Sequence, residues 1–258
     1  MPPPTRRLRG LDDQTLQVWK VRPFDELMSA FAAVRQVAVR QRPLGMVTGA
    51  AGSGKTFCAQ VFQKNERDVV IVTVPPKDIL SARLLLDELA LGLDMEPQSY
   101  RTRADLFFAL VDSLISHPRF LIVDEADRLR PSLADLLREL AELSGQPLCY
   151  LGCPSLDAIV ARVPATHHRI GFRHNVKPVE LEDVEAALVG KSLDPDGRRR
   201  LDKSTVDAIF ECTRGNLRHM ESLVHLLRGA RNTRTSQPYD ITPSTVQILN
   251  RRFQKLAA

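Results

Sequence analysis

The stretch Gly49-Ala-Ala-Gly-Ser-Gly-Lys-Thr56 decides how this sequence is interpreted. It matches the pattern G-x-x-x-x-G-K-[ST], in which glycines let the backbone turn tightly so that its N–H groups face a phosphate. A short apolar run, Leu44–Thr48, precedes it, and a helical pattern over 55–63 follows it, as this pattern requires. We therefore predict a phosphate-binding loop; the alternative is a glycine-rich turn without a ligand. The residues expected to contact nucleotide are Gly49, Ala50, Ala51, Gly52, Ser53, Gly54, Lys55, Thr56 and Phe57.

A second motif, Phe120-Leu-Ile-Val-Asp-Glu125, completes the chemistry. A buried strand would deliver Asp124 at its carboxyl end, where ligands bind in parallel sheets. With ATP and Mg²⁺ as cofactors, Lys55 would reach the β- and γ-phosphates, while Thr56 and Asp124 would hold the metal. Glu125 would then polarise the attacking water as a general base. Taken alone, the motif would more simply be an acidic turn at a strand end.

Short apolar runs alternate with helical patterns along the first two thirds of the chain. This alternation predicts a parallel sheet covered by helices on both faces, which is the α/β class. The helical patterns include Ile79–Leu93 and a helix packed by one face through Leu133, Leu136, Leu137, Leu140 and Leu143. Strand signals stop after Pro178. We expect a flexible basic tail over 1–20, an α/β core over 21–178 and a small helical domain over 179–258, ending in a basic helix.

Composition excludes several classes of protein. The chain has 258 residues, of which 43% are hydrophobic and 26% charged, as in ordinary globular proteins. No apolar run approaches the ~20 residues that cross a bilayer, so no membrane partner is expected. The four cysteines form no CxxC pair, which favours a reduced, cytoplasmic setting. The net charge is +5 and both ends are basic, which fits a nucleic-acid partner or, equally, a solvated surface.

The order of these motifs resembles that of the AAA+ ATPases. The stretches Phe120–Leu129 and Leu151-Gly-Cys-Pro-Ser-Leu156 are most similar to the MuB/TnsC/TniB transposition regulators, and the likeness covers roughly residues 20–228. The resemblance implies a P-loop AAA+ sheet with a small C-terminal helical lid. It also implies a homo-oligomer, either a ring or a helical filament, that assembles on double-stranded DNA with ATP. Such an assembly, nucleoid-associated in the cell, would deliver target DNA to a transposase.

The resemblance also assigns three regulatory positions. Cys153 falls where the family places its first sensor, with Ser155 as the fallback; a thiol is a poor hydrogen-bond donor, so slow turnover is expected. Arg169 fits the arginine finger best, with Arg162 and Arg173 as the other candidates. Arg218, in Gly215-Asn-Leu-Arg218, would be the second sensor. Each has a simpler alternative: a small packed residue for Cys153 and surface charge for the arginines.

The loops that wrap DNA in this family correspond here to Pro75–Asp78 and Tyr100–Arg103. Lys77, Arg101 and Arg103 would contact phosphates without reading sequence, although each could be ordinary loop charge. The arginines of 198–200 and 251–252 could extend a basic stripe.

Two departures from the longer relatives stand out. Because only ~45 residues precede the loop, we expect no separate helix-turn-helix domain there, and because nothing after 230 resembles a targeting domain, we expect none of that kind either. Three other functions remain open besides a transposition regulator. They are a replication initiator or helicase loader, a weakly hydrolysing DNA scaffold and, least favoured, a small-molecule kinase.

Overall fold

The computed structural model describes residues 22–37, 43–193, 199–229 and 240–257. The chain divides into two compact units, which we describe separately. The first is Glu26–Pro178. The second contains the described residues from Val179 onward, together with Arg22–Asp25. The expected tail over 1–20 lies outside the described residues, as does Arg198.

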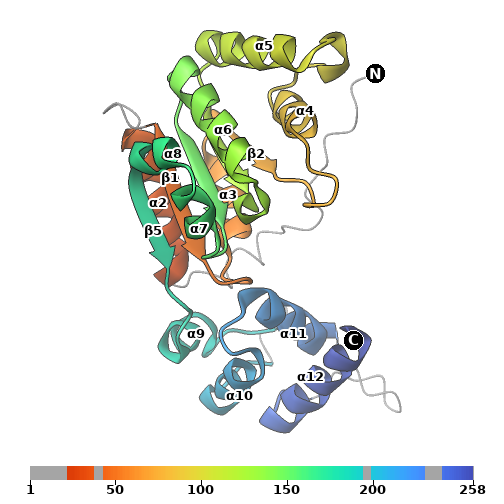
Figure 1. Ribbon diagram of the computed structural model, residues 1–258. Helices are drawn as coiled ribbons and strands as arrows, with labels where there is room; N and C mark the ends of the chain where they lie inside the picture. The colour runs from red at the N-terminus through yellow and green to blue at the C-terminus, as the bar shows by residue number, and fades with distance from the viewer. Residues whose placement is uncertain (1–21, 38–42, 194–198, 230–239, 258) are drawn as a thin grey trace. The chain divides into compact units, whose positions relative to one another are not determined.

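The first unit is built on a five-stranded parallel sheet with the order β2-β3-β4-β1-β5 (Figure 1). Its strands are β1 (Leu44–Gly49), β2 (Val69–Thr73), β3 (Phe120–Asp124), β4 (Leu148–Gly152) and β5 (Ile170–Val176). Every residue of β1, β3 and β4 is buried, which explains their continuous apolar runs. Strand β5 lies at an edge and mixes buried with polar exposed residues.

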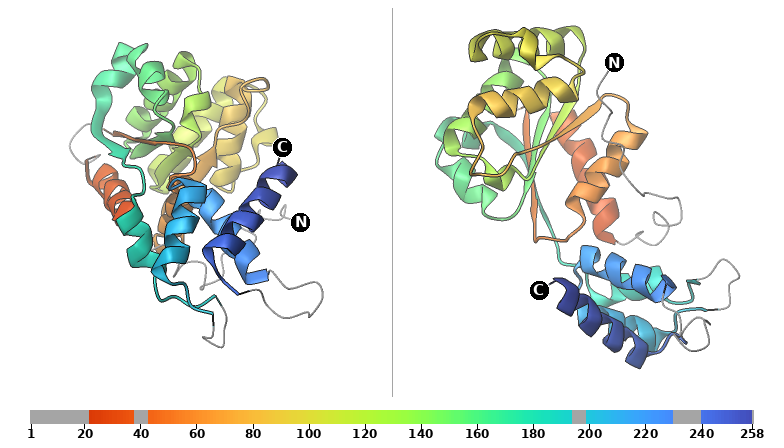
Figure 2. Two further views of the ribbon diagram at one scale, coloured as in Figure 1. Left: turned by 90° about the horizontal axis from the view of Figure 1, so that it is seen from below. Right: turned by 90° about the vertical axis from the view of Figure 1, so that its right-hand side faces the viewer.

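Helices cover both faces of the sheet (Figure 2). One face carries α2 (Arg22–Val37) and α3 (Lys55–Asn65); the other carries α4 (Ala82–Gly92), α5 (Arg103–Ser116), α6 (Pro131–Ser144), α7 (Leu156–Ala161) and α8 (Pro164–Arg169). Between α2 and the sheet, the Phe62 ring lies 5.6 Å from Phe31 and 6.2 Å from Phe120. Helix α2 also approaches β1 closely, because a Cβ on Gly45 would lie 2.3 Å from Val34 Cγ2.

Two helical predictions need correction. Helix α4 begins at Ala82 rather than Ile79, because the Ser81 hydroxyl accepts a hydrogen bond from the Leu84 N–H and caps the helix there. Ile79 is left exposed in the preceding turn. In α6, Leu133, Leu137 and Leu140 are buried as predicted, but Leu143 is 56% exposed. It lies ten residues after Leu133, close to the end of the helix at Ser144.

The second unit is helical in its described part. It contains α9 (Leu181–Leu188), α10 (Lys203–Thr213), α11 (Leu217–Gly229) and α12 (Pro243–Ala257). Helix α10 packs against the other three. Buried apolar side chains hold the helices together: Val184, Leu188, Val206, Ile209, Met220, Leu223, Val224, Leu227 and Val246. None of the helices described in either unit combines the length and the apolar character that crossing a bilayer requires.

Candidate nucleotide-binding site

The loop between β1 and α3 has the backbone conformation that its glycines predict. Gly52 and Gly54 have φ of 80° and 86°, a left-handed region that other residues rarely adopt. Gly54 immediately precedes α3, so the loop leads directly into the positive end of that helix. The fold therefore provides a cradle in which backbone N–H groups and a helix terminus can meet an anion.

Lys55 is turned into this loop. Its Nζ lies 2.8 Å from Gly49 O, 2.9 Å from Ala50 O and 3.3 Å from Ser53 Oγ, and the residue is only 8% exposed. Burial lowers the pKa of its ammonium, and nearby acidic groups, among them Asp124, oppose that shift. Neutral loop oxygens thus solvate a buried cation, and a phosphate oxygen would compensate its charge better.

The two motifs meet through one hydrogen bond. Thr56 Oγ1 donates to Asp124 Oδ2 at 2.8 Å, although the residues are 68 positions apart in the chain. The Glu125 N–H donates to Asp124 Oδ1 at 2.9 Å. Asp124 is 3% exposed, and burial raises the pKa of its carboxyl. The contact holds a hydroxyl and a carboxylate side by side at the carboxyl end of the sheet.

This pair fits Mg²⁺ bound together with nucleotide. Mg²⁺ in such sites usually keeps several waters and takes one or two protein oxygens plus substrate phosphates. Within the described ranges there is no cluster of three or more histidine, cysteine or acidic residues that could hold a metal. The Thr56 hydroxyl and the Asp124 carboxylate are oxygen donors of the kind that Mg²⁺ takes alongside substrate phosphates.

Glu125 occupies a strained position beside the loop. Its φ of 57° is unusual for a residue other than glycine, asparagine or aspartate. Its Oε2 lies 3.6 Å from Arg128 Nη2, and Arg128 Nη1 donates to Val74 O at 3.0 Å. Arg128 thus connects the predicted general base to the chain just beyond β2. Arg128 was not predicted from the sequence as a site residue, although its position three residues after Glu125 was an available signal.

The predicted sensor position is held by a second missed residue. Asp127 Oδ1 accepts a hydrogen bond from the Cys153 N–H at 2.9 Å. The same carboxylate oxygen would lie 2.7 Å from a Cβ placed on Gly152, so a larger residue at the end of β4 would displace the Asp127 side chain. Asp127 therefore ties the turn after β3 to the end of β4. The sensor role of Cys153 itself stays a prediction.

Comparison with known proteins supports this interpretation. Residues 38–160 match the family described as AAA domain. A Staphylococcus aureus protein named "Potential ATP-binding protein" is 28% identical over 111 residues, which are 42% of this chain and 40% of that protein. The chain thus spans well under half of that relative.

Solved structures share the fold over most of the chain. The Aeropyrum pernix ORC2 protein (ADPNP-ADP complexes) aligns with a TM-score of 0.64 and 13% identity, over 87% of this chain and 66% of that one. The Aeropyrum pernix ORC1 protein in complex with DNA aligns with a TM-score of 0.60 and 16% identity, over 87% of this chain and 64% of that one. Domain III of the Thermotoga maritima replication initiation protein DnaA aligns with a TM-score of 0.58 and 16% identity, over 89% of this chain and 93% of that one. The chain has the AAA+ P-loop fold.

The three AAA+ arginine-finger candidates differ in their surroundings. Arg162 follows α7 and is exposed. Arg169 is the last residue of α8, directly before β5, and its Nε lies 2.7 Å from Glu142 Oε1. Arg173 lies within β5, and its Nη1 is 2.9 Å from Asp157 Oδ1. Of the three, Arg169 lies directly before the fifth strand, where the resemblance places the finger, and its role as a finger stays a prediction.

Arg218 belongs to the second, helical unit. Helix α11 begins at Leu217, and Asn216 Oδ1 caps it by accepting from the His219 N–H at 3.0 Å. Gly215 has φ of 70°, and a Cβ there would lie 2.5 Å from Val179 O. The Gly-Asn-Leu-Arg sequence thus forms a tight helix start that leaves Arg218 exposed in its first turn. Its contact with nucleotide stays a prediction.

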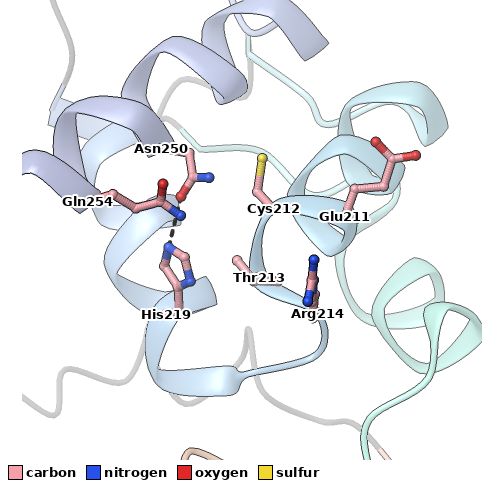
Figure 3. Close-up of a pocket in the computed structure, with 7 residues that line it drawn as sticks. All are labelled: Glu211, Cys212, Thr213, Arg214, His219, Asn250 and Gln254. Carbon is pink, nitrogen blue, oxygen red and sulfur yellow. Dashed lines mark hydrogen bonds between the residues drawn. The ribbon is translucent and has the colours of Figure 1, made fainter.

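A polar hollow of about 520 Å³ lies in the same unit (Figure 3). Figure 3 shows that the ends of α10 and α11 and the middle of α12 surround it. His219 Nε2 lies 2.9 Å from Asn250 Oδ1, and the His219 ring stacks on Phe253 at 5.2 Å. The hydrogen bond and the ring contact of His219 join α11 to α12, which is a structural role.

The predicted DNA-binding residues lie on two segments that meet at one end of α4. Lys77, Arg101 and Arg103 are all exposed. Arg83, in the first turn of α4, donates to Tyr100 O at 3.0 Å and to Pro97 O at 2.8 Å. It thereby holds the segment that leads to Arg101 against the start of α4, which follows the turn that carries Lys77.

Proposed function

We propose that this protein is an AAA+ ATPase that binds Mg²⁺·ATP and assembles with further copies on duplex DNA. The hydrogen bond between Thr56 and Asp124 is the observation that carries the proposal, because it joins the two nucleotide motifs at one point beside Lys55. We further propose Glu125 as the general base, Arg169 as the finger that reaches a neighbouring copy and Arg218 as a second sensor.

The reaction that this arrangement supports is hydrolysis of the γ-phosphate. A water oxygen forms a bond to the γ-phosphorus while the bond to the β-phosphate oxygen breaks, giving ADP and inorganic phosphate. Glu125 accepts the proton of the water. Lys55 leaves its loop carbonyls and binds the β- and γ-phosphate oxygens. Thr56 and Asp124 would hold Mg²⁺, which supplies neutralising charge when bound. Because Cys153 is a weak hydrogen-bond donor, turnover is slow.

The proposed DNA contact rests on exposed charge. Arg83 holds the segment before Arg101 against the start of α4, the helix that follows the turn with Lys77. The side chains of Lys77, Arg101 and Arg103 can therefore act on one phosphate backbone. Such contacts bind DNA without regard to sequence and weaken steeply with salt. A protein of the same fold, ORC1 of Aeropyrum pernix, was solved in complex with DNA.

We propose a transposase as the client of the assembly, following the resemblance of Phe120–Leu129 and Leu151–Leu156 to the transposition regulators. A replication initiator or helicase loader is the second candidate. The shared architecture with a domain of the initiation protein DnaA favours that second candidate. Pull-down of a transposase or a helicase by the ATP-bound assembly separates the two.

Sedimentation and negative-stain imaging with duplex DNA test the proposal directly. The protein is examined with ATP, with ADP and without nucleotide, each at two salt concentrations. We expect rings or filaments on DNA only with ATP, and fewer of them at the higher salt. A protein that stays monomeric and off DNA in every state would contradict DNA assembly and leave an ATPase with an unknown client.

A further inference from the structure

Glu142 is a carboxylate whose second oxygen faces the finger candidate. It lies on α6, two residues before that helix ends. Its Oε1 is buried and accepts no hydrogen bond from any described residue, while Arg169 Nε lies 2.7 Å away in ion-pair contact. A buried carboxylate oxygen without a hydrogen bond needs a compensating charge. The guanidinium of Arg169 supplies that charge.

Glu142 is itself fixed by a row of alternating charges along α6. Arg138 Nη1 binds the other carboxylate oxygen of Glu142, and Arg138 Nε lies 2.6 Å from Asp135 Oδ1. The Arg138 side chain is only 13% exposed, and its bond to Asp135 lowers the pKa of that carboxyl. The contacts of Arg138 with Asp135 and with Glu142 therefore hold Glu142 in one place.

The same row ties α8 to α6 at a second point. Thr166, fully buried on α8, donates to Asp135 Oδ1 at 3.2 Å. Arg169, one turn later on α8, pairs with Glu142. Helix α6 is anchored in turn by its buried leucines and by Tyr150, whose hydroxyl donates to Ala134 O at 2.7 Å. Arg169 therefore lies on the short helix α8, which two contacts hold against α6.

We propose that Glu142 is a positioning residue that presents Arg169 to the γ-phosphate held by a neighbouring copy of this chain. The contact engages only Nε, and both Nη groups of Arg169 have no partner among the residues that the structure describes. These two donors form the planar fork that binds a phosphate bidentately. Fixing the guanidinium in advance lowers the conformational entropy lost when the neighbour binds.

The other finger candidates lack this support. Arg173 is paired with Asp157, and Arg162 has no ion pair with a described residue. Glu139 offers a matched control, because it also contacts Arg138, at 3.3 Å, but not Arg169. Its side chain is 50% exposed. The inference rests on the proposed assembly, since the fork needs a second copy to act on.

A double-mutant cycle on ATP hydrolysis tests the inference. Wild type, Glu142→Gln, Arg169→Ala and the double variant are assayed on DNA at saturating protein. We expect Arg169→Ala to lower kcat about 10³-fold, as loss of a finger does. Glu142→Gln should lower kcat about 10-fold with unchanged KM for ATP, and Glu139→Gln should leave both unchanged. The double variant should be no slower than Arg169→Ala alone, because Glu142 acts only through Arg169.

A mixing experiment adds a measurement that a folding defect would not mimic. Glu125→Gln chains carry a well-placed Arg169 but cannot hydrolyse ATP, whereas Glu142→Gln chains retain Glu125. Equal amounts of the two should hydrolyse faster than Glu142→Gln alone. If mixing gives no such rescue, Glu142 is not a positioning residue. The same conclusion follows if Glu142→Gln lowers kcat as much in the Arg169→Ala variant as it does in wild type. If wild-type specific activity does not rise with protein concentration, the proposed assembly itself fails.

Discussion

Two regions at the carboxyl end of the sheet use their charges in opposite ways. In the nucleotide loop, the charged groups of Lys55 and Asp124 are buried and each is bonded to neighbouring groups. Near the start of α4, Lys77, Arg101 and Arg103 are exposed and have no ion pair within the described part of the chain. If both proposed roles hold, the nucleotide loop acts through the positions of single atoms, whereas the region at α4 acts through summed charge.

The largest effect should come from the proposed general base. Glu125→Gln keeps the shape of the side chain but removes its ability to accept a proton, so kcat should fall about 10²- to 10⁴-fold. ATP affinity should stay the same, and the assemblies on DNA should persist. Phosphate release and fluorescent-nucleotide titration measure the two effects. Unchanged turnover would remove Glu125 from the mechanism and weaken the contrast between the regions.

Lys55→Ala comes next. It removes the cation that the loop is built around, so the Kd for ATP should rise about 100-fold, or about 3 kcal/mol for a lost charge-assisted bond. Isothermal titration with ATP checks this result. Lys64→Ala, an exposed lysine near the end of α3, serves as the control and should bind ATP normally. Equal affinities for both variants would show that the loop does not hold phosphate.

At the exposed region, single changes should matter little and combined ones more. Replacing Lys77, Arg101 and Arg103 together by alanine should weaken DNA binding about 10-fold or more. The slope of log Kobs against log salt should become shallower by about 2.7, at ~0.9 for each lost phosphate contact. Fluorescence anisotropy over a salt series measures both quantities. ATP binding should not change, and an unaltered slope would place the DNA on another surface.

The smallest effect concerns stability. Burial raises the pKa of Asp124 above its usual 3.8, so the folded state keeps this proton to a higher pH than the unfolded chain does. The free energy of unfolding should therefore fall as the pH rises from 3.8 to the higher pKa of the folded state. Without nucleotide, the free energy of unfolding of Asp124→Asn should not fall in this way. At neutral pH the variant should be about 1 kcal/mol more stable than wild type. Melting curves between pH 4 and 8 test this, with the exposed Asp78→Asn as control.

Much of the fold could be predicted from local sequence. Strands β1 to β4 are continuous apolar runs, and the glycines at 52 and 54 mark the loop. Strand β5 carries no such run, because an edge strand needs only part of its residues buried. Asp127, Arg128 and Glu142 were missed for a different reason. Their partners Cys153, Val74 and Arg169 are 26, 54 and 27 positions away, and only the folded sheet brings each pair together.

The contact between Gly45 and Val34 has a consequence for how this sequence can diverge. A single methyl group on residue 45 would enter the space of the Val34 side chain, so that position cannot drift to alanine by itself. A change there must follow a prior loss of volume at position 34. Among homologues, the two positions should therefore covary, with alanine at 45 found only beside glycine at 34, because even the Cβ of Val34 would lie 2.9 Å from the new methyl group.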